Sequence, residues 1–287
     1  MKTLHIFFST LLFAFTFTLF NSCSVEKNKV RVMSFNIRYD NPADSANAWA
    51  FRKDSVAAYI QSTGSDIIGM QEVLNNQLND LQTELPDYAY VGVGREDGHT
   101  KGEYAPIFYR KDKFELVDGS TFWLSESPDS VSLGWDAACV RIATWAKLKN
   151  KQTGAIFLAV NTHFDHVGVE ARRQSALLII EKIKEIVGEH PAMLTGDFNV
   201  SDSSEAYQTL TTNAFVLKDA WKVASHKEGV EYTFHDFGRY PQDQREKIDF
   251  IFVTPNITVG KAVIKSSELS NGLYLTDHNP HFADLEF

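Results

Sequence analysis

The feature that most constrains the fold is a series of short apolar runs spread along almost the whole chain. About ten are predicted to be β-strands, some because apolar and polar residues alternate, others because a short run is continuously apolar. They are Val30–Ile37, Asp66–Val73, Ala105–Arg110, Phe114–Leu124, Arg141–Leu148, Ala155–Phe164, Pro191–Val200, Lys247–Val253, Thr258–Lys265 and Pro280–Phe287.

Helix-like segments lie between these runs. Arg52–Thr63 and Asn75–Leu85 are amphipathic, and Glu170–Gly188 has the clearest helical spacing. This mixed order predicts an α/β fold in which two mixed β-sheets pack face to face with helices outside. No linker interrupts residues 30–287, and a chain of 287 residues that is 44% hydrophobic can fill one large core, so we expect a single domain.

The N-terminal stretch differs from the rest. Lys2 precedes the apolar run Ile6–Phe20, which is short for a membrane span and typical of a signal peptide. The run is followed by Ser22 and Cys23, and this ending resembles a bacterial lipoprotein signal that is cleaved before Cys23 and leaves Cys23 lipidated. Ordinary cleavage and a buried N-terminal helix are the alternatives.

This interpretation divides the chain into a leader at 1–23, a short tether at 24–29 and the domain at 30–287. It predicts an exported protein, periplasmic or at the cell surface, with a membrane attachment through the N-terminal lipid. Ser24 after the lipidated cysteine favours an outer-membrane lipoprotein.

Charge and cysteine content narrow the classes of partner. The only charged residue of the leader is Lys2, so its removal takes the formal net charge from −9 to −10. A negative surface repels a nucleic-acid backbone, whereas a small phosphorylated substrate can still bind in a local pocket. Cys139 is the only other cysteine, so the fold has no internal disulfide. We expect a monomer, with nucleic acid possible but not favoured.

Polar residues follow several of the apolar runs, at the strand ends where such scaffolds place their active groups. They are Asn36, Glu72, His163, Asp197 and Asn199. Each has a simpler explanation, because asparagines close turns, carboxylates cap helices and a histidine can be part of the core.

Asp249 is harder to explain in this way, because it lies inside the apolar run "KIDFIF". A buried carboxylate is costly without a partner, and an imidazolium would serve. Near the C-terminus, "LYLTDHNPHF" places Asp277 beside His278. Either this stretch is a solvated turn, or the two neighbours face different partners.

Together these residue types suit hydrolysis of a phosphate ester. That reaction needs a hard cation on oxygen ligands, a group that activates water, and donors for the phosphate oxygens. Carboxylates supply the first, a histidine–aspartate pair the second, and asparagine with histidine the third. The lack of thiolates argues against a structural zinc site.

Six motifs carry a specific resemblance. "SFNIR", "GMQEV", "NTHFDH", "GDFN", "KIDFIF" and "TDH" occur in this order, and 30–287 resembles the endonuclease/exonuclease/phosphatase superfamily of pancreatic-type deoxyribonuclease, neutral sphingomyelinases and inositol-polyphosphate 5-phosphatases. The resemblance implies a four-layered α/β/β/α sandwich and dependence on Mg²⁺ or Mn²⁺. The greatest similarity is to bacterial members of the lipoprotein type.

The resemblance also implies roles for single residues. Glu72 matches the principal metal ligand of the family, with Asn36 and Asp277 close to the ion. Asp197 and Asn199 match the pair that orients the attacking water and stabilises the transition state.

The remaining matches concern histidines. His163 matches a donor to a phosphate oxygen, and Asp249 with His278 matches a dyad in which the carboxylate orients the imidazole. Either Asp197 or His278 is the general base.

Four further residues are candidates for substrate contact. Tyr109 and Arg141 occupy places where family members touch phosphate, with a packing or surface role as the alternative. Asp165 is expected to line the pocket or orient its neighbours, and a metal site formed by Asp165 and His166 with His163 is the less favoured interpretation. Trp123 is a candidate platform for a sugar or base, although tryptophans more often belong to the core.

The leading hypothesis is an exported, metal-dependent phosphoesterase that attacks a small phosphodiester or phosphomonoester with activated water. A nuclease acting on DNA or RNA is the alternative within the class. The rival from another class is a non-catalytic surface module that binds glycans or phosphorylated ligands. The intact catalytic set argues against it.

Overall fold

The computed structural model describes Met1 and residues 28–212, 215 and 217–287. Apart from Met1, the predicted leader, the lipidation site Cys23 and most of the tether at 24–29 lie outside the described residues. Among the residues that are described, no helix has the length and apolar character that crossing a bilayer requires.

One sheet has seven strands and is mixed. Its central strand β1 runs parallel to β2 on one side and antiparallel to β13 on the other. In spatial order the strands are β10 (His226–Gly229), β12 (Thr258–Ile264), β13 (His281–Glu286), β1 (Lys29–Asn36), β2 (Ile67–Gln71), β4 (Ile107–Arg110) and β3 (Tyr88–Val91).

The second sheet has six strands and is also mixed, because β7 and β8 are parallel while the other neighbours are antiparallel. Its order is β5 (Phe114–Trp123), β6 (Ile142–Asn150), β7 (Ile156–His163), β8 (Ala192–Asp197), β11 (Asp249–Val253) and β9 (Lys218–Asp219).

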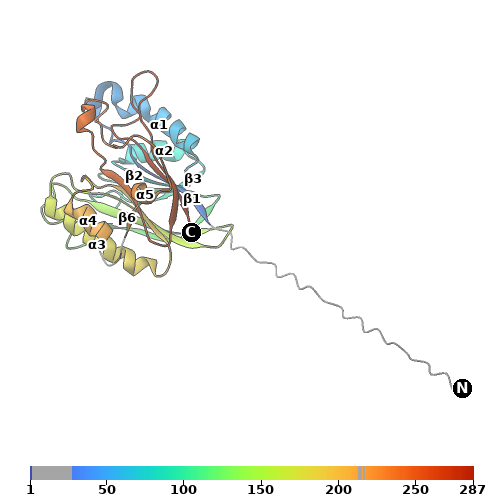
Figure 1. Cartoon of the computed structure of the whole chain (residues 1–287). Helices are drawn as coiled ribbons and strands as arrows, with labels where there is room; N and C mark the ends of the chain where they lie inside the picture. The colour runs from blue at the N-terminus through green and yellow to red at the C-terminus, as the bar shows by residue number, and fades with distance from the viewer. Residues whose placement is uncertain (2–27, 213–214, 216) are drawn as a thin grey trace.

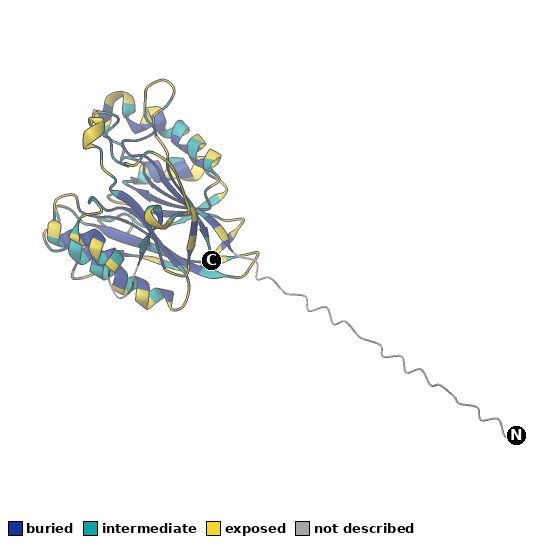
Figure 2. Cartoon of the chain, viewed as in Figure 1, coloured by how far each residue is buried: buried dark blue, intermediate teal, exposed yellow. Residues whose placement is uncertain are grey.

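Helices cover the outer face of each sheet (Figure 1). The pair α1 (Trp49–Thr63) and α2 (Asn75–Glu84) buries its apolar side against the first sheet, and α3 (Val169–Val187) with α4 (Glu205–Thr212) does so against the second. The short segments η1 (Pro42–Asn47), α5 (Ala220–Val223) and η2 (Gln242–Gln244) lie in the connections. Figure 2 shows the strands largely buried and the outer sides of the helices exposed. The predicted four-layered α/β/β/α sandwich is confirmed.

The space between the sheets is apolar over most of its area, with residues such as Ile67, Phe157 and Ile251 in contact. A buried polar network lies further along, toward the strand ends. The Asn161 amide donates to the carbonyls of Met70 and Pro106 at 2.6 and 3.0 Å, and so ties the second sheet to the first.

Gly69 makes this close approach possible. A Cβ atom there would lie 2.0 Å from Oγ1 of Thr195 and 2.5 Å from Oδ1 of Asn161, far inside van der Waals contact. The sheets therefore approach each other closely just before the strands end, and the residues that follow these strands are brought together.

Candidate active site

The strand register collects the predicted site residues at one edge of the sandwich. In the first sheet Asn36 ends β1 opposite Gln71, so that Glu72 follows directly beside it. In the second sheet His163 ends β7 opposite Asp197, and the antiparallel β11 begins with Asp249 opposite that same aspartate. Parallel strands end at the same edge, so residues far apart in the sequence become neighbours.

A cavity of about 490 Å³ opens at this edge. It is lined by Arg38, Tyr39, Glu72, Arg95, Glu103, Cys139, Arg141, His163, His166, Asp197, Asn199, Phe234, Asp236, Ile248, Asp277 and His278. Such a volume suits a small molecule enclosed on several sides.

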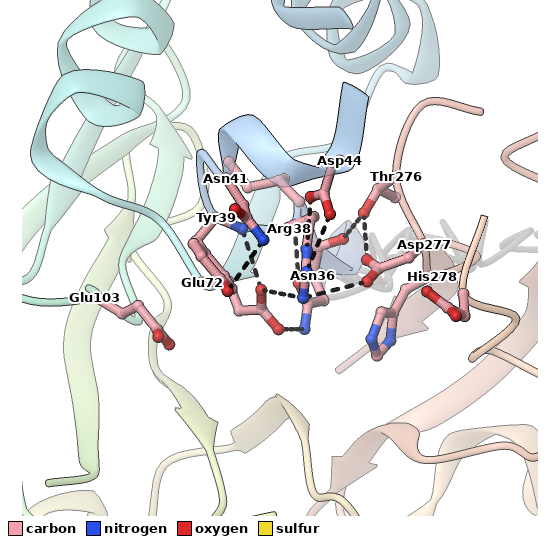
Figure 3. A network of polar contacts seen from close by, with 12 residues as sticks. Asn36, Arg38, Tyr39, Asn41, Asp44, Glu72, Glu103, Thr276, Asp277 and His278 are labelled. Atoms are coloured by element: carbon pink, nitrogen blue, oxygen red, sulfur yellow. Dashed lines mark hydrogen bonds and ion pairs between the residues drawn. The ribbon is translucent and has the colours of Figure 1, made fainter. Parts of the chain in front are cut away.

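Glu72 and Asp277 lie on either side of Asn36 and Arg38 (Figure 3). Glu72 has a positive φ of 62°, and its carboxylate accepts from the Asn36 amide at 3.1 Å and from the Tyr39 backbone N–H at 3.0 Å. Nη1 of Arg38 lies 3.8 Å from Glu72 and 3.7 Å from Asp277, and a bidentate contact with Asp44 holds that guanidinium in place. Two carboxylates from different loops thus face one common space.

Asn36 bridges the carboxylates through its nitrogen. Nδ2 donates to Glu72 at 3.1 Å and to Asp197 at 2.9 Å, while Oδ1 accepts from the backbone N–H of Arg38 at 3.0 Å. The backbone donor fixes this orientation, since a flipped amide would place two donors together. The structure therefore places Asn36 as an orienting group between the carboxylates rather than with its oxygen toward them.

The "GDFN" turn presents its two polar side chains to the pocket. Asn199 has a positive φ of 50°, and its backbone N–H donates to Oδ1 of Asp197 at 3.0 Å. Its side-chain nitrogen donates to the Phe164 carbonyl at 3.0 Å and lies 3.1 Å from Nε2 of His163. The turn holds Asp197 and Asn199 in one fixed arrangement beside His163.

The predicted dyad is present. Nδ1 of His278 lies 2.8 Å from Oδ2 of Asp249, and Nε2 on the opposite side of the ring lies 3.7 Å from Oδ2 of Asp197. Burial acts to lower the pKa of His278, but the surrounding carboxylates, Asp249 first, raise it to about 10. Asp277 faces away from this dyad, toward Thr276 and Arg38. The two neighbours in "TDH" do face different partners.

His163 has the opposite character. Burial, reinforced by the Arg141 guanidinium, lowers the pKa of His163 to about 3, so the ring is neutral. Its Nε2 accepts from Asn199, which places the ring proton on Nδ1, 3.6 Å from Oε2 of Glu103. The site thus combines one charged and one neutral imidazole.

The donor set fits a hard divalent cation. Ligand atoms of Glu72, Asp197 and His278 all lie within 4.8 Å of one another. The Asp277 carboxylate lines the same cavity, 3.7 Å from Nη1 of Arg38. Burial, together with the charge of Glu72 and against that of His278, raises the pKa of Asp277 to about 6. Closely spaced buried carboxylates need a positive charge, and carboxylate oxygens are the ligands that Mg²⁺ and Mn²⁺ prefer.

Of the four predicted substrate contacts, Arg141 lines the pocket and Asp165 is buried beside Arg141. Arg141 is also buried, with Nη2 3.1 Å from Nδ1 of His166. Within the described part of the chain, its Nε and Nη1 have no hydrogen-bond partner. Asp165, 3.5 Å from Nε of Arg141, accepts from the backbone N–H groups of Val167 and Gly168. It therefore orients its neighbours, and the structure does not pair it with His163.

The other two do not reach the pocket. Side chains alternate along β4, so Tyr109 points with Ile107 into the core between the sheets. Trp123 packs against Ala105 and Ile142, and its indole N–H donates to the Arg95 carbonyl at 2.8 Å. The expected substrate contacts at Tyr109 and Trp123 are thus replaced by packing, and Trp123 supports the segment that carries Arg95.

The sequence profile described as the Endonuclease/Exonuclease/phosphatase family matches residues 33–278. The chain belongs to this family. Its members are hydrolases that act on phosphoesters and depend on divalent metals.

Two solved structures from Bacteroides are similar to this family member over nearly its whole length. An endonuclease/exonuclease/phosphatase from Bacteroides vulgatus is 64% identical with a TM-score of 0.89, covering 91% of this chain and 100% of that one. A mannosyl-6-phosphatase from Bacteroides thetaiotaomicron is 39% identical with a TM-score of 0.84, covering 90% and 100%.

A relative from another branch of the family is longer. Nocturnin from Drosophila melanogaster is 25% identical over 212 residues, which are 66% of this chain and 32% of that protein. The chain therefore spans about a third of the length of this curated relative.

Several residues that line the pocket were not predicted from the sequence. Arg38 follows the "SFNI" strand within a quoted motif, so its position at the strand end was a usable signal. Arg95, Glu103 and Phe234 lie in loops with no strand-end or motif pattern. Their arrival at the pocket depends on tertiary packing, as with Phe234, whose ring centroid lies 5.0 Å from that of His278.

Proposed function

We propose that this chain is an exported, Mg²⁺- or Mn²⁺-dependent phosphoesterase that hydrolyses a small phosphomonoester, with a sugar phosphate as the leading substrate class. One observation carries the proposal. A single small cavity combines a cluster of carboxylates, a charged His278–Asp249 dyad and a neutral His163 that Asn199 holds in place.

The metal would be held by Glu72 and Asp277, with Asn36 fixing the spacing between Glu72 and Asp197. When bound, it neutralises phosphate charge and polarises the phosphorus–oxygen bonds.

The chain's own groups perform the remaining work. Asp197 lies between two imidazoles, 3.5 Å from Nε2 of His163 and 3.7 Å from Nε2 of His278. We assign removal of the water proton to the Asp197 carboxylate, because the His278 ring is already protonated. Nε2–H of His278 and Nδ1–H of His163 are the donors for the phosphate oxygens, whereas Asn199 uses both side-chain N–H groups on Phe164 and His163 and so holds the His163 ring in place. Asp249 keeps the His278 ring oriented.

Two observations favour a small sugar phosphate over nucleic acid. The chain is acidic overall, and the mannosyl-6-phosphatase is 39% identical along nearly its full length. Within the described residues, Nε and Nη1 of Arg141 make no hydrogen bond and lie 3.5 and 4.0 Å from the carboxylates of Asp165 and Glu103, and we take this guanidinium as the partner for the additional negative charge of a monoester. We further propose that the protein is a monomer, exported through its leader and tethered to the outer membrane at Cys23.

The test is a hydrolysis panel on the chain lacking its leader, with Mg²⁺, Mn²⁺ or EDTA. It includes mannose 6-phosphate, other sugar and inositol phosphates, a bis-aryl phosphodiester, sphingomyelin and single- and double-stranded DNA. We expect EDTA-sensitive turnover of a sugar phosphate that is lost in His278→Ala. Turnover confined to the diester or DNA would overturn the substrate class, and a folded, metal-binding chain silent on the whole panel would overturn the proposed function.

A further inference from the structure

Arg52 is a buried guanidinium whose partners are backbone carbonyls. It lies in the first turn of α1 and is 3% exposed. Its Nε donates to Asn47 at 2.8 Å, Nη1 to Ile37 and Leu275 at 2.5 and 2.9 Å, and Nη2 to Arg38 at 2.8 Å. Four of its five N–H groups are thus used on carbonyls at the ends of regular structure.

These carbonyls belong to segments that carry the candidate metal ligands. Ile37 and Arg38 follow Asn36 at the end of β1, and Leu275 lies two residues before Asp277. One side chain therefore fastens the end of β1 to the loop that ends in "TDH".

Gln77 performs the matching task for the Glu72 loop. It is fully buried in α2, and its Nε2 donates to the same Arg38 carbonyl at 2.8 Å. Its Oε1 accepts from the backbone N–H of Leu74, two residues after Glu72, and from that of Asp40, both at 3.0 Å. Arg52 and Gln77 thus both donate to the carbonyl of Arg38.

The backbone at this junction needs such support. Arg38 and Glu72 both have positive φ values, 59° and 62°, which cost a residue other than glycine about 1–3 kcal/mol. Only surrounding structure that over-determines the conformation keeps it populated. The carbonyl of Arg38 and the loop after Glu72 are the groups that Arg52 and Gln77 hold.

We propose that Arg52 and Gln77 form a clamp that sets the separation of Glu72 and Asp277, and thereby the affinity of the site for its divalent cation. Both are positioning residues, since they contact backbone rather than ligand atoms. The proposal rests on the metal dependence proposed above. Outer groups that orient ligands typically change metal affinity by about 10–100-fold when replaced.

Substitutions separate the clamp from general stability. Arg52→Lys keeps the charge, but one ammonium cannot reach carbonyls spread over three segments. Arg52→Met and Gln77→Met keep the length of the side chain and remove its donors. Val56→Ala is the matched control, because Val56 is fully buried one turn further along α1 and packs only in the core.

The experiment is calorimetric titration of Mn²⁺ into the chain lacking its leader, with thermal unfolding measured alongside. We expect the Kd for Mn²⁺ to rise about 10–100-fold in Arg52→Lys and Gln77→Met, and to stay within about twofold in Val56→Ala at a comparable loss of Tm. If Arg52→Met does not fold, the other two clamp variants decide.

Two failures are distinguishable. Wild-type protein that binds no Mn²⁺, or binds it equally well after Glu72→Ala, overturns the proposed metal dependence itself. If wild-type protein binds Mn²⁺ through Glu72, and Arg52→Lys and Gln77→Met bind it as tightly as wild type, the clamp is overturned and the proposed function still stands.

Discussion

The substitution Asp249→Asn tests the catalytic proposal most directly. Asp249 is buried at the start of β11, and its Oδ2 lies 2.8 Å from Nδ1 of His278. The amide has nearly the same shape as the carboxylate but no charge. If its nitrogen faces the ring, the ring proton moves to Nε2. If its oxygen faces the ring, the tautomer survives but the charge that stabilises the imidazolium is gone.

The structure gives the scale of the effect. The carboxylates around His278, Asp249 first, raise its pKa to about 10 from an ordinary value of 6.5. Because a tenfold change in acid dissociation corresponds to about 1.4 kcal/mol, the charged ring is favoured by several kcal/mol. Other imidazoles that lose their orienting carboxylate lose about 10⁴ in kcat, so we expect a loss of about 10³–10⁴ here.

The assay is steady-state hydrolysis of mannose 6-phosphate with saturating Mn²⁺, combined with calorimetric titration of the metal. We expect kcat to fall while the Kd for Mn²⁺ changes by less than about threefold. Asp219→Asn is the control, since Asp219 is equally buried in the neighbouring strand β9 but pairs with Lys247, away from the pocket. It is expected to lower Tm and leave kcat nearly unchanged.

Two results would refute this reasoning. A kcat in Asp249→Asn within a few-fold of wild type means that the dyad is structural. A kcat loss that merely follows the lost Mn²⁺ affinity means that Asp249 acts on the metal site rather than on the ring.

Further predictions concern other parts of the molecule. Glu72→Ala should remove Mn²⁺ binding and turnover together, and turnover without metal in this variant would contradict the ligand assignment. Arg141→Lys should raise KM for a sugar phosphate about tenfold with a smaller change in kcat, because the planar fork is lost; an unchanged KM would exclude a substrate contact. Gly69→Ala should destabilise the fold by about 1–3 kcal/mol, as its Cβ would lie 2.0 Å from Thr195 Oγ1, and denaturant unfolding would show it. Burial opposes the ionisation of Asp165, but the N–H groups of Gly168 and Val167 hold its pKa below the usual range. The stabilisation by the charged Asp165 is therefore complete above about pH 4 and is lost as the pH falls below that value. At pH 7 the free energy of unfolding of Asp165→Asn should be about 1.5–3 kcal/mol below that of wild type, and this difference should shrink in acid. A difference independent of pH would contradict this.

The long strands of the core could be predicted because they are long enough to show a pattern. The edge strands β3, β9 and β10 have four, two and four residues and were not predicted, since so few positions cannot establish a period. The run Pro191–Val200 was predicted as one strand, whereas β8 ends at Asp197. The positive φ of Asn199 turns the chain there, and a pattern of apolar residues does not predict such a turn.

The catalytic set was predictable for a related reason. Most of its members lie at strand ends, so strand register brings them together once the sheets are correct. Asp277 and His278 precede β13 in a loop and were predicted from the "TDH" motif. The positions of pocket residues that lie in loops, such as Glu103 and Arg95, cannot be predicted from strand register. Tyr109 illustrates the converse, because it lies within a strand and its direction follows from alternation against Phe108, which packs on the opposite face.

Backbone strain explains why the site needs more structure than its ligands. Arg38, Glu72 and Asn199 all have positive φ values, and each follows a different strand that ends at the pocket. In a regular strand Glu72 would point to the face opposite Gln71, whose side chain contacts Asn161 of the second sheet, and so away from that sheet. The left-handed conformation of Glu72 breaks this alternation and directs its carboxylate toward the pocket, and the same conformation at Asn199 turns the chain after β8. The cost, about 1–3 kcal/mol for each residue, must be met by contacts that do not touch the substrate. The Asp197 carboxylate that accepts the Asn199 N–H meets it in the second sheet, and Arg52 with Gln77 meets it in the first. The first sheet needs two buried polar side chains for this, because its ligands Glu72 and Asp277 lie on separate loops. In the second sheet Asp197 and Asn199 lie on the single "GDFN" turn.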